Sequence, residues 1–206
     1  MASQEEEIIR WYYLTGGTAL AEFYLHHRLS EDVDLFSVSE VNDKEIDKMI
    51  QKYVQKEKAI DFEKRRIAGL FLYQVNFSDG SLKIDFNNFP YEPVERGVLF
   101  NKNLKIDSFY DIAINKTYTI LGRFQTRDFI DLYFILKKGE FSLEQLISRT
   151  EEKYNTKIDP FYLASQFLRV MDLPRAYPKM LVPFNFAQMA DFFKQKAKRL
   201  GEKVMK

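Results

Sequence analysis

The chain has 206 residues, of which 46% are hydrophobic and 16% aromatic; this composition supports a packed core and excludes a wholly disordered chain. It contains no cysteine, which excludes disulfides, thiolate metal sites and cysteine nucleophiles. The formal net charge of +1 gives no global argument for nucleic-acid binding, and no apolar run reaches the ~18 residues that would cross a bilayer. The first ten residues are acidic rather than basic, so we expect a cytoplasmic protein with no membrane partner.

The hydrophobic pattern of the first half predicts helices that alternate with strands. In chain order, the expected elements are a short helix over residues 4–9, an aromatic strand over 10–14, a helix over 18–28 and a strand over 32–36. Thr18 is the expected N-cap of the second of these helices. Asn42 followed by Glu45 forms a capping-box pattern, which predicts a further helix from this point.

The middle of the chain is rich in strand patterns, and the remainder is helical. Three strand candidates cover residues 59–66, 69–77 and 81–89, and the last two flank "SDGS", whose Asp-Gly pair is a hairpin signal. From about residue 107 the period becomes helical to the end of the chain. We therefore predict an α+β fold, with a mixed or antiparallel sheet in residues 1–105 and a helical C-terminal subdomain in residues 106–206.

Two aspartates stand one residue apart in the strand expected over residues 32–36. Side chains alternate along a strand, so Asp32 and Asp34 should share one face while Val33 and Leu35 point into the core. Neighbouring carboxylates repel each other, and a hard divalent cation such as Mg²⁺ relieves that repulsion. Asp85, in a strongly apolar strand, is expected to complete a site with three carboxylates if its strand lies beside the first.

A Gly-Gly turn precedes these acids. Gly16 and Gly17 lie where a strand is expected to pass into a helix, a place where glycine lets the backbone approach a phosphate closely. Thr18 would add a hydroxyl, although an ordinary tight turn accounts for the glycines equally well. Each feature is weak alone, whereas the turn, the spaced aspartates and the later strand aspartate in this order are more specific.

The basic C-terminal end leaves two interpretations open. The last sixteen residues hold six Lys and Arg against two acids. They fit a solvated lysine-rich helix, or a tail that faces RNA or a protein partner.

These motifs resemble a known family. "GGTALAEFYLHHRLSEDVDLF" (residues 16–36) is similar to the opening motif of the nucleotidyltransferase superfamily that includes DNA polymerase β. More narrowly, it resembles the AbiEii/AbiGii toxin family, whose members have GGTALA and then YL-x-HR-x-S-x-D-x-D-x-F. "NKTYTILGRFQTRDFIDLYFIL" (residues 115–136) resembles that family's later Lys, Arg and (K/R)D-x-x-D-L-Y pattern. The likeness covers roughly residues 10–136; Gly-Gly in place of Gly-Ser, and fourteen residues between Gly17 and Asp32, favour the narrower family.

The resemblance implies a role for each matched residue. The metal ligands would be Asp32, Asp34 and Asp85, and Asp85 would also help to deprotonate the acceptor hydroxyl. The remaining implied roles are a triphosphate cradle at Gly16, Gly17 and Thr18, charge neutralisation at pyrophosphate by Lys116, and nucleotide binding by Arg123, Arg127 and Asp131. Arg127 would contact phosphate, and Asp131 would orient Lys116 or the base.

Structural alternatives stand beside these roles. Lys116 could be an exposed helix lysine, and Asp128 could interact only with the dipole of its helix. Asp131 could pair only with Arg127, four residues before it. His27 with Arg28 would shape the loop that leads to Asp32.

The resemblance implies an Mg²⁺-dependent enzyme that moves an NMP from an NTP to an acceptor hydroxyl. It further implies the toxin of a toxin–antitoxin or phage-defence pair, with RNA, and especially the tRNA 3′ end, as acceptor and an antitoxin as partner. The alternatives are a protein or small-molecule (antibiotic) acceptor, or an inactive nucleotide-binding interaction module.

Overall fold

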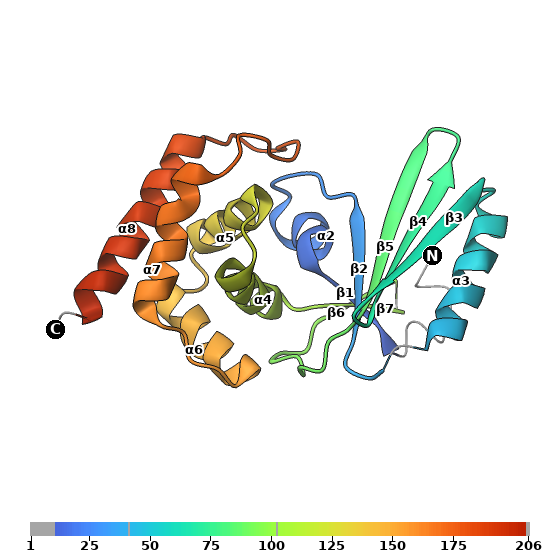
Figure 1. The fold of residues 1–206 in the computed structure, drawn as a ribbon, viewed down its shortest axis with the longest axis horizontal. Helices are drawn as coiled ribbons and strands as arrows, with labels where there is room; N and C mark the ends of the chain where they lie inside the picture. Colours follow the sequence, from blue (N-terminus) through green and yellow to red (C-terminus); the bar gives the residue numbers. More distant parts are fainter. Residues whose placement is uncertain (1–10, 41, 102, 205–206) are drawn as a thin grey trace. The chain divides into compact units, whose positions relative to one another are not determined.

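The computed structural model describes residues 11–40, 42–101 and 103–204, so the helix expected over residues 4–9 lies outside the described residues. The chain divides into two compact units (Figure 1). The first unit comprises residues 1–19 and 30–108, and the second comprises residues 20–29 and 109–206. The second unit therefore takes a short segment from the N-terminal half of the sequence.

The first unit is built on a mixed sheet. Its strands are β1 (Tyr13–Thr15), β2 (Asp32–Ser37), β3 (Asp61–Ile67), β4 (Leu70–Phe77), β5 (Gly80–Asn88), β6 (Val98–Phe100) and β7 (Leu104–Ile106). They lie in the order β3-β4-β5-β2-β1-β7-β6. The β2–β5 and β1–β7 pairs are parallel, and the other neighbouring pairs are antiparallel. The predicted α+β class with a mixed sheet is confirmed.

Strand alternation places the core of this unit on one face of the sheet. Leu35 of β2 and Ile84 and Phe86 of β5 are fully buried, and Tyr73 of β4 packs its ring edge-on against Phe86. Helix α3 (Asp43–Lys56) lies beside β3 (Figure 1), and its Asp47 accepts hydrogen bonds from Lys64 of β3 and Tyr73 of β4. Its start agrees with the prediction, because the side chain of Asn42 accepts a hydrogen bond from the Glu45 amide.

Three details differ from the sequence-based expectation. The helix expected over 18–28 is α2 (Gly16–Leu20) followed by a π-helical turn, Ala21–Leu25. It ends there because His26 adopts a left-handed conformation with φ 48°. The hairpin between β4 and β5 is present, but Phe77 pairs with Gly80, so its turn residues are Ser78 and Asp79. Strands β6 and β7 were not predicted, since three-residue strands are too short to show alternation.

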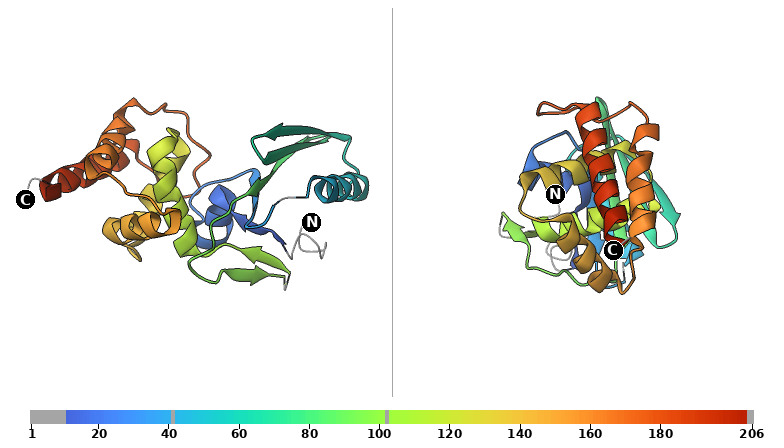
Figure 2. Two further views of the ribbon diagram at one scale, coloured as in Figure 1. Left: turned by 60° about the horizontal axis from the view of Figure 1, so that its bottom comes forward. Right: turned by 90° about the vertical axis from the view of Figure 1, so that its left-hand side faces the viewer.

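The second unit is helical. Its helices are α4 (Phe109–Gly122), α5 (Thr126–Lys138), α6 (Leu143–Tyr154), α7 (Pro160–Leu168) and α8 (Phe186–Val204), with a 3₁₀ turn at Arg169–Asp172. Helix α4 packs against α5, α6 and α7, and α7 runs beside α8 (Figures 1 and 2). Inside this unit the Lys153 ammonium lies 2.7 Å from the fully buried Asp111 carboxylate. None of the helices in the described part of the chain is long and apolar enough to span a membrane.

Candidate functional site

The three predicted metal-binding aspartates lie on two neighbouring strands. Asp34 of β2 is directly across from Asp85 of β5, and Asp32 is across from Lys83. Partners in a ladder point to the same face, so these four side chains lie together on the face opposite Leu35, Ile84 and Phe86. The structure therefore brings together the residues that sequence reasoning picked from segments about fifty positions apart.

Lys83 is a member of this cluster that sequence reasoning missed. Its ammonium lies 2.7 Å from Asp85 Oδ2 and 3.9 Å from Asp32 Oδ2. Burial lowers the pKa of Lys83, but the hydrogen bond to Asp85 and the charges of Asp85, Asp32 and Asp34 outweigh it and raise the pKa above its ordinary value. Lys83 is therefore a protonated counter-charge. The period of two that places Asp32 and Asp34 on one face also places Lys83 with Asp85, and could have revealed it.

The donor chemistry of this cluster fits a divalent cation. Among the described residues, no group of three or more His, Asp or Glu side chains is gathered tightly enough to hold an ion. However, Asp32 and Asp85 already share one positive charge, that of Lys83. Mg²⁺ commonly binds through one or two carboxylates together with substrate phosphates, so a complete protein cage is not required.

Gly16 has a specific structural reason to be glycine. Its φ is +72°, in the left-handed region. A Cβ at this position would overlap the carboxylate of Asp34 and come within 3.0 Å of its Cγ. The turn therefore packs directly against a predicted metal ligand. Gly17 follows inside α2 and is buried.

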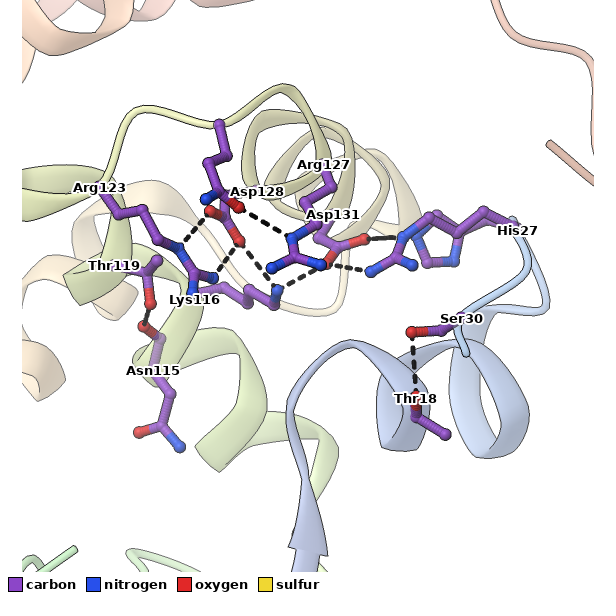
Figure 3. Close-up of polar contacts among 12 residues, drawn as sticks. Thr18, His27, Ser30, Asn115, Lys116, Thr119, Arg123, Arg127, Asp128 and Asp131 are labelled. Atoms are coloured by element: carbon purple, nitrogen blue, oxygen red, sulfur yellow. Dashed lines mark hydrogen bonds and ion pairs between the residues drawn. The ribbon is translucent and has the colours of Figure 1, made fainter. Parts of the chain in front are cut away.

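Thr18 and Thr15 connect the strands near this turn. The Thr18 hydroxyl lies 2.9 Å from Ser30 Oγ (Figure 3) and also contacts the main-chain carbonyl of Asp32, so it fixes the start of β2. Thr15, across from Asp34 in the β1–β2 ladder, donates a buried hydrogen bond of 2.7 Å to Asp107 Oδ2. Neither Thr15 nor Asp107 was predicted, because only the β1–β2 pairing places Thr15 beside Asp34 and only the hydrogen bond links Asp107 to Thr15.

Three of the predicted residues of the second unit, Lys116, Arg123 and Asp131, form a charge network with Asp128, in which Lys116 and both carboxylates are buried (Figure 3). The Lys116 ammonium lies 2.6 Å from Asp131 Oδ2 and 3.1 Å from Asp128 Oδ1. Arg123 donates from Nε and Nη2 to the two oxygens of Asp128, each over 2.7 Å. Lys116 is 6% exposed, so its interpretation as an exposed helix lysine is wrong. Arg127 donates to the Gln125 side chain over 2.9 Å.

Asp131 is the centre of this network. Besides Lys116, it accepts hydrogen bonds from Arg28 Nε (2.7 Å) and Nη2 (2.8 Å) and lies 2.8 Å from His27 Nε2. Burial raises the pKa of Asp131, but the Lys116 charge and the hydrogen bonds from Arg28 and His27 outweigh it and hold the pKa far below its usual range. The alternative in which Asp131 pairs only with Arg127 is therefore wrong. Since Asp131 is fully buried, the geometry supports its predicted role in orienting Lys116 rather than a direct contact with a base.

The partners of Asp131 on the N-terminal side were not predicted. His27 and Arg28 are buried and belong to the second unit, although they precede β2 in the sequence. Two adjacent residues after a helix show no period that would point to an aspartate more than a hundred positions away.

Comparisons with known proteins agree with this architecture. Residues 2–199 match the family model described as "Nucleotidyl transferase AbiEii toxin, Type IV TA system". The protein aq_aa25 of Aquifex aeolicus (strain VF5) is 28% identical over 201 residues, which cover 93% of this chain and 88% of that protein.

Solved structures show the same fold. JHP933 from Helicobacter pylori superposes with a TM-score of 0.59 at 21% identity, over 99% of this chain and 93% of its own. MenT4, a nucleotidyltransferase toxin from Mycobacterium tuberculosis H37Rv, gives a TM-score of 0.54 at 16% identity, over 93% of this chain and 75% of its own.

The contact between Gly16 and Asp34 predicts that a methyl group added at Gly16 strongly lowers the free energy of unfolding. Gly69→Ala, at a glycine with φ +84° where an added Cβ would meet no atom within 4 Å, should cost about 1–2 kcal/mol from backbone strain alone. Gly16→Ala should cost about 1–3 kcal/mol more, because the Asp34 carboxylate must also move. Urea denaturation of both variants measures the difference, and equal losses would show that Asp34 does not restrict this position.

The burial of Asp131 predicts a large and pH-dependent stability loss. Asp131→Asn removes the buried carboxylate charge that Lys116 and Arg28 share, although Asp128 still lies beside Lys116, and should cost about 3–5 kcal/mol. A carboxylate whose folded-state pKa is depressed stabilises the fold above the unfolded pKa, about 4, and this contribution is lost as pH falls below it.

The free energy of unfolding should thus fall more steeply in the wild type than in Asp131→Asn between about pH 5 and pH 2. Asp191→Asn is the matched control, because Asp191 is exposed and its pair with Lys194 spans 3.7 Å. Its effect should stay within about 0.5 kcal/mol. Equal effects of the two substitutions would contradict the assignment of Asp131 as the centre of the network.

Proposed function

Because the chain belongs to the AbiEii family of nucleotidyl transferase toxins of Type IV toxin–antitoxin systems, we propose that it transfers an NMP from an NTP to a hydroxyl of an RNA acceptor in an Mg²⁺-dependent reaction. The resemblance seen in the sequence motifs is thereby confirmed, and the chain is a nucleotidyltransferase toxin by family. The tRNA 3′ end is the proposed acceptor, and an antitoxin the proposed protein partner. Phage defence is the proposed setting.

The observation that carries this proposal is the register of β2 and β5. It aligns Asp34 with Asp85 and lets Asp32 and Asp85 share one cationic group. These carboxylates are the proposed ligands of Mg²⁺, together with the phosphates of the NTP. A cation bound there supplies positive charge that offsets the charge on the attacking and leaving oxygens.

The protein residues then have the following roles. Gly16 leaves room for the Asp34 carboxylate, and Thr18 fixes the start of β2 through the Asp32 carbonyl. The acceptor oxygen attacks the α-phosphorus of the NTP, the bond from that phosphorus to the β-phosphate oxygen breaks, and pyrophosphate leaves. Asp85 is the proposed acceptor of the hydroxyl proton, and main-chain N–H groups at Gly16 and Gly17 are the proposed phosphate contacts.

The roles proposed for the second unit follow from its charge network. Lys116 is the proposed group that neutralises charge on pyrophosphate, and Asp128 and Asp131 hold its ammonium in one position. Arg123 and Arg127 are the proposed contacts to phosphate. Lys and Arg number 18 in this unit against 12 Asp and Glu, a formal charge of +6, which favours a polyanionic acceptor such as RNA.

Replacement of Asp34 tests the proposed reaction. With labelled NTPs, Mg²⁺ and total tRNA, the wild type should label RNA, and Asp34→Asn should reduce the rate at least about 100-fold with an unchanged fold. Asp79→Asn, at an exposed acid in the β4–β5 turn, is the matched control and should remain active. Label on protein or a small molecule would replace the RNA acceptor, and no label with any acceptor pool would contradict the reaction itself.

The position of Lys83 predicts that its ammonium competes with a divalent cation for the carboxylates. This competition can be measured without turnover. Lys83→Gln removes a charge that a divalent cation must displace, so the affinity for Mn²⁺ alone should rise about fivefold, the equivalent of about 1 kcal/mol for unit charges 4 Å apart in water. Lys83→Arg keeps the charge and should retain the weaker wild-type affinity. Calorimetric titration with Mn²⁺ provides the values, and equal or weaker binding by Lys83→Gln would contradict the competition.

A further inference from the structure

The second unit contains a cavity of about 550 Å³ where the end of α4 meets the start of α7. Its wall combines aromatic rings and cations, principally Tyr118, Arg123, Lys157 and Tyr162. This volume lies in the range of about 300–1,000 Å³ that small-molecule sites occupy. Only Arg123 among these four belongs to the roles described above.

Tyr118 lines this cavity, and a stacking partner holds its ring. It stacks on Tyr154 with ring centroids 3.8 Å apart and planes within 8° of parallel. The Tyr154 hydroxyl donates to Asn115 Oδ1 over 2.9 Å, and this hydrogen bond fixes the Tyr154 ring of the stack. Tyr154 covers one face of Tyr118 and does not line the cavity, whereas Tyr118 lines it and is 39% exposed. A planar ligand can therefore extend an existing stack.

Tyr162 provides a second held ring. Its hydroxyl donates to the Leu121 carbonyl over 2.8 Å, yet the residue remains 49% exposed. The ring loses little conformational freedom when a ligand binds, because its position is already fixed.

The charges around the cavity favour an anion. Arg123 is 46% exposed although Asp128 holds it, and Lys157 is 91% exposed although its ammonium lies 3.5 Å from Glu151 Oε2. Another nearby acid, Asp159, is engaged as the N-cap of α7, where its side chain accepts from the amides of Phe161 and Tyr162. The whole unit carries a formal charge of +6.

We propose that this cavity binds an unpaired nucleotide of a single-stranded RNA acceptor, with its base stacked on Tyr118 and its phosphates near Arg123 and Lys157. The proposal rests on the proposed function, since it names where the acceptor is held. Single-stranded RNA is recognised by base stacking on aromatic rings beside cations, and this combination lines the cavity.

Binding of a labelled single-stranded RNA of about twelve nucleotides, measured by fluorescence anisotropy, tests the site. Tyr118→Leu should weaken binding about 5- to 100-fold, because it removes the stacking face, and Tyr118→Phe should bind like the wild type. Lys157→Gln should reduce the slope of log K against log salt concentration by about 0.7. Tyr177→Leu is the matched control, because Tyr177 is 47% exposed in the same unit but does not line the cavity.

The outcomes separate this inference from the proposed function. Unchanged RNA binding by Tyr118→Leu, in a wild type that labels RNA, would overturn the site and leave the reaction in place. Tyr118-dependent RNA binding by a wild type that transfers no nucleotide would support the site and overturn the reaction. If Tyr118→Leu no longer labels a protein acceptor while its RNA binding is unchanged, the occupant of the cavity is a protein, and this result would overturn the inference.

Because Tyr118 packs on Tyr154, thermal unfolding of each variant is measured first. If Tyr118→Leu does not fold, Tyr162→Leu and Lys157→Gln carry the same test. NTP binding should be unchanged in all of these variants, and a parallel loss of NTP binding would overturn a site specific to the acceptor.

Discussion

The parallel pairing of β2 with β5 is the constraint on which the candidate site depends. Its register places Asp34 across from Asp85 while Leu35 and Phe86 meet in the core on the other face. A slip of one residue would turn the carboxylates of one strand toward the apolar side chains of the other. The burial of Leu35, Ile84 and Phe86 therefore fixes where the acids stand, so stability and chemistry are set by the same alternation.

Both units must also offset clustered carboxylates, and they do so in different ways. In the sheet, Lys83 is half exposed and can be displaced, because water can replace its contacts to Asp32 and Asp85. In the helical unit, Asp131 is fully buried and its partners are Lys116, Arg28 and His27, so removal of its charge reduces the compensation of two buried cations at once. The first arrangement suits an exchangeable cation, and the second suits a permanent framework.

Local sequence patterns predicted the elements with regular periods, and tertiary pairing decided the rest. Strands β2 to β5, helix α3 and the carboxylates Asp32, Asp34 and Asp85 followed from alternation, capping and apolar context. The short β6 and β7, the left-handed His26 and the Arg28–Asp131 pair did not, because each depends on a partner or conformation that leaves no repeated local signal. The place of Lys83 on the same face as Asp85 could have been predicted from the two-residue period of the strand alone.

The net charge of +1 conceals the most informative electrostatic feature of the chain. The first unit holds 13 Lys and Arg against 18 Asp and Glu, a formal charge of −5, whereas the second carries +6. A count within each predicted half would have revealed nearly the same split, since the boundary falls close to residue 105 in either division. An acidic unit and a basic unit fit the proposed metal-dependent reaction on RNA better than the overall charge suggests. The overall net charge is therefore uninformative about a nucleic-acid partner, because it averages over two units of opposite charge.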